Sequence, residues 1–182
     1  REPTPSALCI DRQSVKTPEV GGPERGYDGG KHIKGRKRQI LVETLGLLVA
    51  VLLTSAGGDD GRAASHLLTR IARPALPRLT TSFGATKDHN HTLEAWLATE
   101  RPAWPLEVTA RPEGRSGCTP VRMRWVVERT NAWNGRGRRH SKDYERKPAS
   151  STAMVQISNI NLMMPRLAPR PAPTFHYRKN VA

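Results

Sequence analysis

Large apolar side chains and cysteines are scarce in this 182-residue sequence. Leu, Ile, Val and Phe together supply only 35 residues, and there are two cysteines, Cys9 and Cys118. The cysteines stand too far apart for a CxxC metal or redox motif, so we expect buried free thiols in a reducing compartment. The small apolar fraction predicts a thin core, close to the composition at which chains stay disordered.

Long hydrophobic segments are also missing. The N-terminus has no apolar stretch of the kind found in secretory signals, which argues against export. The longest apolar run, residues 45–53, is much shorter than the roughly 20 residues that cross a bilayer, so we expect no membrane partner. The length predicts one domain, residues 1–167, and the Pro-rich basic residues 168–182 predict a disordered tail.

Positive charge is what the sequence has in excess. Thirty Lys and Arg residues against 16 Asp and Glu residues give a formal net charge of +14. This excess implies an acidic partner, with nucleic acid the first candidate and an anionic membrane the second. Ordinary solvated charge is the alternative interpretation of such runs. Two clusters concentrate the charge: Lys31, Lys34, Arg36, Lys37 and Arg38, then Arg136, Arg138, Arg139, Lys142, Arg146 and Lys147.

The spacing of apolar residues predicts a mixture of strands and helices. We expect strands at residues 7–10, on both sides of a tight turn at Leu45-Gly46, and at residues 79–83 and 105–108. Helices are expected after a cap at Asp59 or Asp60, over residues 92–99 and 121–134, and from residue 151 until Pro165 ends the last one. We expect residues 21–38 to form a Gly-rich loop whose second half is basic. This order indicates a mixed α/β domain.

Three sequence blocks resemble the C-terminal part of bacterial insertion-sequence transposases of the DDE superfamily. They are DRQSVKTPEVGGPERGYDGGKHIKGRKRQILVETLGLL from Asp11, RWVVERTNAW from Arg124 and RRHSKDYERKPASSTAMVQI from Arg138. The resemblance implies a ribonuclease H-like mixed sheet flanked by helices, here N-terminally truncated. It also implies metal-dependent DNA strand cleavage and transfer, binding to double-stranded transposon ends, a possible homodimer on DNA, and a bacterial, cytoplasmic, nucleoid-associated location.

The resemblance also implies a metal site built from three carboxylates. Such carboxylates hold two Mg²⁺ (or Mn²⁺) ions that activate the attacking oxygen and stabilise the leaving one. The matching blocks place the first at Asp11 and the last at Glu128, which shares a helix face with Trp125 and Ala132 and is therefore expected to point inward. A turn-capping Asp and a surface ion pair are the alternatives. The implied DNA-binding residues are Lys31, Lys34, Arg36, Lys37, Arg38, Arg124, Arg138 and Arg139.

The second carboxylate of this pattern is missing. Its place is at the end of the strand around residues 79–83, where the sequence has Phe83-Gly84-Ala85, and Asp88 is at best a displaced substitute. Polar residues also replace apolar ones that the family expects, at Asn131, Asn134, Asn159 and Asn161. We therefore predict a degenerate, inactive transposase copy. The alternatives are a non-catalytic basic DNA-binding remnant, or a chain that never folds stably because each buried unpaired amide costs about 1–3 kcal/mol.

Overall fold

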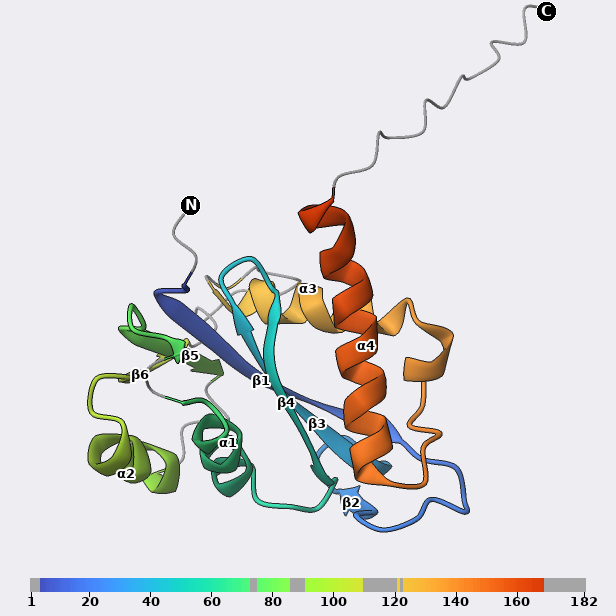
Figure 1. Cartoon of the computed structure of the whole chain (residues 1–182). Coiled ribbons are helices and arrows are strands. Elements are labelled where there is room, and N and C mark those ends of the chain that lie inside the picture. The colour runs from blue at the N-terminus through green and yellow to red at the C-terminus, as the bar shows by residue number, and fades with distance from the viewer. Residues whose placement is uncertain (1–3, 73–74, 86–90, 110–120, 122, 169–182) are drawn as a thin grey trace, which may run out of the picture.

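The computed structural model describes residues 4–72, 75–85, 91–109, 121 and 123–168, and within them the chain forms six strands and four α-helices (Figure 1). In chain order these elements are β1 (Ala7–Lys16), β2 (Gly26–Asp28), β3 (Ile33–Glu43), β4 (Leu48–Ser55), α1 (Asp60–Thr69), β5 (Thr81–Ala85), α2 (His91–Glu100), β6 (Leu106–Thr109), α3 (Arg124–Gly135), a short 3-10 helix η3 (Arg138–His140) and α4 (Pro148–Leu167).

All of these strands belong to one mixed sheet. Its order is β2-β3-β1-β5-β6, and β4 pairs with β3 beside β2. β1, β3 and β4 are antiparallel neighbours, whereas β1, β5 and β6 run parallel. Because β1 lies between the antiparallel and parallel halves, it forms the centre of the sheet, as Figure 1 shows.

Helices cover both faces of this sheet. Side chains of a strand alternate between its two faces, and β1 follows that rule: Leu8 and Ile10 pack with α1 and α2, whereas Cys9 packs with α3 and α4. The result is a three-layer arrangement with an apolar core on each side of the sheet. The mixed α/β architecture predicted from the sequence is confirmed.

Two predicted turns form as the local sequence suggests. At the β3–β4 turn, Gly46 has a φ of +80°, which favours glycine, and the Glu43 carboxylate accepts hydrogen bonds from the backbone N–H groups of Leu45 and Leu47 at 2.8 and 3.2 Å. At the start of α1, the Asp59 side chain accepts from the Arg62 N–H at 2.7 Å, as an N-cap residue does. Both predictions are confirmed.

Three local predictions are wrong. Residues 21–38 are not a continuous loop, because they contain β2 and the first half of β3, which pairs with neighbours along both edges. Asp11 stands in the middle of β1, since this strand continues to Lys16. Pro165 does not end α4, because it lies in the last turn, where one missing N–H donor leaves the earlier turns intact.

No helix in the part of the chain that the structure describes is both long and apolar enough to cross a membrane.

Candidate active site

Asp11 lies on the face of the sheet that α3 covers. The amide Nδ2 of Asn131, on α3, donates a hydrogen bond to Asp11 Oδ2 at 2.9 Å. Burial raises the pKa of the Asp11 carboxyl above its ordinary value. The backbone N–H of Arg12 and the positive charges of Lys31, Arg124 and Arg12 act in the opposite direction. Asp11 is therefore a half-buried carboxylate with cations and one amide as its neighbours.

Glu128 is on α3, as expected, but the prediction that it points inward is wrong. Its side chain is 53% exposed and pairs with Arg124, whose Nε lies 3.0 Å from Glu128 Oε1. Trp125 and Ala132, on the same face, are also exposed. Trp125 stacks on the Arg129 guanidinium, which lies 4.3 Å from its ring centroid. The buried face of α3 is instead Val126, Val127, Thr130 and Asn134.

The strand that should carry the second carboxylate is β5, which pairs with the part of β1 that precedes Asp11. β5 is parallel to β1, and Cys9 lies opposite Phe83 in their register. Continued by two residues, this register brings position 85 level with Asp11. The residue there is Ala85, which has no ligand atom in its side chain. Asp88, the possible substitute, lies outside the described residues.

Three of the expected DNA-binding cations are buried and engaged within the protein. Arg36 has no exposed surface, and its guanidinium bonds to Asp143 Oδ2 at 3.0 Å and to four backbone carbonyls. Lys37 Nζ lies 2.8 Å from Asp60 Oδ1, and Arg38 donates to the His140 carbonyl at 2.9 Å. These groups do not face a DNA backbone, which corrects the assignment of Arg36, Lys37 and Arg38.

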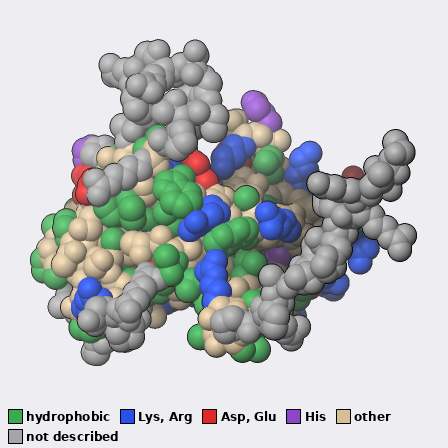
Figure 2. Space-filling view, turned by 90° about the horizontal axis from the view of Figure 1, so that it is seen from above, with side chains coloured by type: hydrophobic (Ala, Val, Ile, Leu, Met, Phe, Trp, Pro, Cys, Tyr) green, Lys and Arg blue, Asp and Glu red, His purple; other side chains and the backbone are tan. Residues whose placement is uncertain are grey.

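The other expected cations stay at the surface. Lys31, Lys34, Arg138 and Arg139 are exposed, and Arg139 pairs with Glu145. The electrostatic influence of Lys31 and Arg124 on Asp11 places both charges near that carboxylate. Figure 2 shows Lys and Arg side chains spread between hydrophobic ones over one face of the molecule, with few acidic side chains among them. Positive side chains are therefore more prominent than acidic ones on this face.

This set of side chains does not fit a two-metal site. Within the described residues there is no group of three or more His, Cys, Asp or Glu side chains that could hold a metal ion. Asp11 already accepts the Asn131 amide, and Glu128 is paired with Arg124. Divalent cations of this kind prefer several oxygen ligands, whereas the neighbours of Asp11 are mostly positive.

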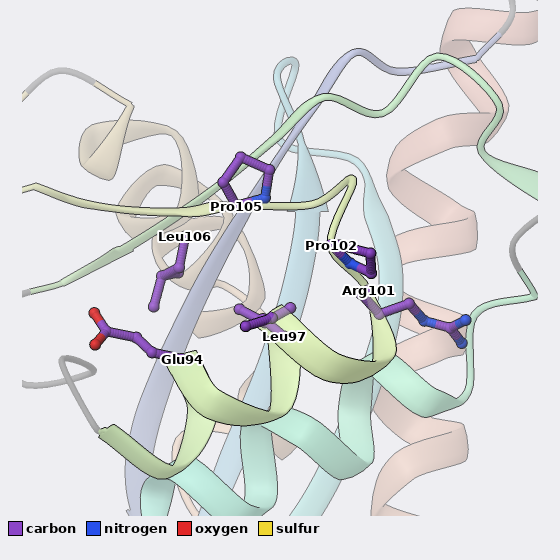
Figure 3. A pocket seen from close by; sticks show the side chains of 7 residues that line it. Glu94, Leu97, Arg101, Pro102, Pro105 and Leu106 are labelled. Atoms are coloured by element: carbon purple, nitrogen blue, oxygen red, sulfur yellow. The ribbon is translucent and has the colours of Figure 1, made fainter.

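A pocket elsewhere on the molecule offers no better site. It has a volume of about 410 Å³ and lies between α2 and the start of β6, on the opposite face of the sheet from α3. Its lining is largely apolar, and Figure 3 shows the charged ends of Glu94 and Arg101 at opposite ends of the pocket. Ligand sites combine apolar walls with a few converging polar groups, and this pocket lacks the convergence.

Asn131 contacts Asp11, although the sequence marks Asn131 only as a departure from the family pattern. Asn131 follows Glu128 by three residues, and residues three apart share a face of a helix. That spacing was a signal that Asn131 faces the same region as Glu128. Its pairing with Asp11 depends on how α3 packs across β1, which no local pattern records.

The transposase DDE domain family matches residues 2–164. The catalytic core domain of BIV integrase has a similar structure, with a TM-score of 0.50 and 10% sequence identity over 91% of this chain and 86% of that one. The piggyBac transposase, solved as a synaptic complex with hairpin DNA, has a TM-score of 0.47 and 11% identity over 87% of this chain and 46% of that one.

No curated protein matches the sequence. The likeness to integrase shows the fold alone, a ribonuclease H-like mixed sheet flanked by helices. The family match covers nearly all of the described elements, and it includes both Asp11 and Glu128. The chain belongs to the transposase DDE domain family.

Proposed function

We propose that this chain binds duplex DNA through its phosphates as a transposase DDE domain, and that it does not cleave or transfer DNA strands. We further propose that the protein acts on the bacterial chromosome in the cytoplasm. Two copies of it would hold two transposon ends together. The Mg²⁺ or Mn²⁺ chemistry of the family belongs to members whose three carboxylates are intact.

The proposed absence of DNA cleavage rests on the residue at position 85. Position 85 comes two residues after Phe83, the last residue of β5 that pairs with β1, just as Asp11 comes two residues after its partner Cys9, and Ala85 supplies no carboxylate there. Two carboxylates, one of them paired with Arg124, leave too few oxygen ligands for a pair of divalent ions. The positive charge of Lys31 acts on Asp11 and favours a phosphate group instead, whereas Arg124 is paired with Glu128 and Arg12 with Asp60 across the sheet.

Two measurements on the full chain test the proposal. In a gel-shift or fluorescence-anisotropy titration, we expect duplexes of unrelated sequence to bind with similar affinity, and this affinity to fall steeply as salt rises. In a nicking assay with Mg²⁺ or Mn²⁺ on DNA carrying the element's terminal repeats, we expect no product. Nicking that disappears in Asp11→Ala would contradict the proposed inactivity.

A folded chain is the condition for both measurements. The amides that suggested instability are paired: Asn134 Oδ1 accepts from Asn159 Nδ2 at 2.9 Å, and Asn131 donates to Asp11. We therefore expect a cooperative thermal transition by circular dichroism. A gradual change without a transition would instead favour a chain that does not fold stably.

A further inference from the structure

The turn between β2 and β3 is held together by one carboxylate. Asp28 Oδ1 accepts hydrogen bonds from the backbone N–H groups of Gly30 and Lys31, both at 3.1 Å. The other oxygen, Oδ2, accepts from the hydroxyl of Ser14 on β1. An Asp that binds the backbone two and three residues ahead fixes the path of a tight turn. The turn, residues 29–32, therefore has a defined shape and a fixed place against β1.

A second contact closes the same turn at its other end. Tyr27 Oη lies 3.0 Å from His32 Nδ1. His32 has a φ of +53°, a left-handed conformation that is uncommon for residues other than glycine. Such a conformation persists where the surrounding contacts determine it. The Tyr27–His32 contact and the Asp28 carboxylate thus both restrict the conformation of the turn.

Gly29 leaves the tip of the turn open. A Cβ atom added at Gly29 meets no atom of the described residues within 4 Å, and the φ of Gly29 lies outside the left-handed range. Neither packing within the described part of the chain nor backbone conformation therefore requires a glycine here. A position without a side chain does allow a ligand to approach the backbone closely. The neighbouring Gly30, Lys31 and His32 are exposed, so this approach comes from solvent.

The charge beside the open tip favours a phosphate as the ligand. Lys31 in the turn and Lys34 on the following strand are both exposed. The positive charge of Lys31 acts on the Asp11 carboxylate, and the Ser14–Asp28 hydrogen bond holds the turn on β1 three residues after Asp11. DNA phosphates are bound by lysines and by backbone N–H groups. An open backbone flanked by lysines is therefore suited to the DNA backbone.

We propose that the β2–β3 turn contacts the DNA backbone and that Asp28 is the residue that positions this turn. The inference rests on the proposed duplex binding and adds the element that makes one of the phosphate contacts. Asp28 is itself negative, so its charge alone weakens the binding of a polyanion. Its contribution is to order the turn before DNA arrives, because a contact that is ordered beforehand costs less conformational entropy.

Two substitutions of Asp28 separate positioning from charge. Asp28→Ala and Asp28→Asn remove the same negative charge, but the Asn side-chain oxygen still accepts from the N–H groups of Gly30 and Lys31. In fluorescence-anisotropy titrations of the full chain with a duplex, we expect Asp28→Ala to bind at least about threefold more weakly than Asp28→Asn. Asp28→Asn is expected to bind at least as tightly as the wild type.

Lys31 and Gly29 provide two further measurements in the same titration. In the Lys31→Ala background, Asp28→Ala is expected to weaken binding less than it does alone, because the lysine that Asp28 positions is gone. Gly29→Leu is expected to weaken binding at least about threefold, since its side chain keeps a phosphate away from the backbone. Gly29→Ala, with a smaller side chain, is expected to weaken it less. Thermal unfolding of each variant shows whether its fold is intact.

Three results would overturn the inference while duplex binding itself remains. They are equal affinities of Asp28→Ala and Asp28→Asn, additive effects of Asp28→Ala and Lys31→Ala, and a Gly29→Leu variant that binds like the wild type. If Asp28→Ala does not fold, the two Gly29 variants decide, because their substitutions leave Asp28 and its hydrogen bonds in place. A wild type that binds no duplex would overturn the proposed function together with this inference.

Discussion

Arg36 shows how a basic residue in the most basic stretch of the sequence becomes structural. Its guanidinium donates to Asp143 and Ser151 and to the backbone carbonyls of Gly21, Pro23, Glu145 and Arg146. Those acceptors come from two segments far apart in the sequence, which Arg36 ties to β3. An arginine fork suits this role, because it presents five donors in a fixed plane.

Replacing Arg36 is expected to destabilise the fold severely. Arg36→Ala leaves the buried Asp143 carboxylate without its cation, and such broken pairs cost about 3–5 kcal/mol. The free energy of unfolding from urea titration measures this loss. Arg139→Ala is the control, because the Arg139–Glu145 pair lies at the surface, where ion pairs contribute at most about 1 kcal/mol. Similar losses in the two variants would contradict a structural role for Arg36.

Position 85 offers a gain-of-function test of the missing carboxylate. Ala85→Asp adds a carboxylate two residues after Phe83, as Asp11 stands two residues after the paired Cys9, and is expected to create divalent-metal binding, seen as Mn²⁺-dependent heat in isothermal titration calorimetry. Ala85→Asn is the control, since its amide has a similar size and no charge. Asp11→Ala in the Ala85→Asp background should abolish the binding. If Ala85→Asp and Ala85→Asn bind metal equally weakly, the register does not place the ligands together.

The metal-ligand roles of Asp11 and Glu128 stay predictions from the sequence. Asp11 and Glu128 stand in motifs that the family match also covers. The burial of Arg36 could not be predicted, because its partner Asp143 lies 107 residues away. The outward direction of the Glu128 side chain could not be predicted either. It depends on Val126 and Val127 taking the inner face of α3, and the Trp125 spacing suggested the opposite.

Helices α3 and α4 are joined by a buried amide pair. Asn159 Nδ2 donates to Asn134 Oδ1 and to the Val155 carbonyl, both at 2.9 Å. Asn159→Leu leaves the Asn134 amide buried without this partner and is expected to cost about 1–3 kcal/mol of unfolding free energy. The double variant with Asn134→Leu removes both amides and is expected to recover most of that loss. A double-mutant cycle by denaturant titration measures the coupling, and strictly additive effects would count against a paired contact.

His140, in the 3-10 helix between α3 and α4, makes this region sensitive to acid. Its ring Nε2 lies 2.6 Å from Ser158 Oγ. Burial, and then the Arg38 charge, lower the pKa of His140 below its ordinary 6.5, while Asp143 opposes them. As pH falls, His140 therefore takes up a proton in the unfolded chain before it does so in the folded one. The contribution of His140 to folding stability is fully present above about pH 6.5 and decreases below it.

The His140→Gln variant tests this dependence. Gln keeps a polar group near Ser158 and does not titrate. We expect the melting temperature of the wild type to fall more than that of His140→Gln between about pH 7 and about pH 5. The difference between the two curves isolates His140 from the carboxylates, which titrate in both proteins. Parallel curves would show that protonation of His140 does not limit stability.

Helices and strands with a regular pattern of apolar residues were predictable from the sequence, and the others were not. The β3–β4 hairpin and α1 follow from apolar runs, a turn glycine and a capping Asp, all of which are local. The first half of β3 is IKGRKR, which lacks an apolar pattern and becomes a strand because β1, β2 and β4 pair with it. Its charges are tolerated inside because partners from distant segments satisfy them.

In the whole molecule, the Lys and Arg residues behind the net charge of +14 fall into a buried group and an exposed group. Arg36, Lys37 and Arg38 are buried among acceptors, so they shape the fold. Lys31, Lys34 and Arg138 are exposed and remain available to a polyanion. The strength of DNA binding is therefore expected to follow the exposed charges alone, and fewer phosphate contacts should form than the composition suggests.

The salt dependence of DNA binding measures the number of those contacts. Each phosphate contact adds about −0.9 to the slope of log K against log salt for duplex DNA. Lys31→Ala, near Asp11, is expected to weaken duplex binding and to reduce the magnitude of this slope by about one. Arg62→Ala is the control, because Arg62 is exposed on α1, across the sheet from α3. Equal slopes for the two variants would place the bound DNA away from Lys31, the lysine whose charge acts on Asp11.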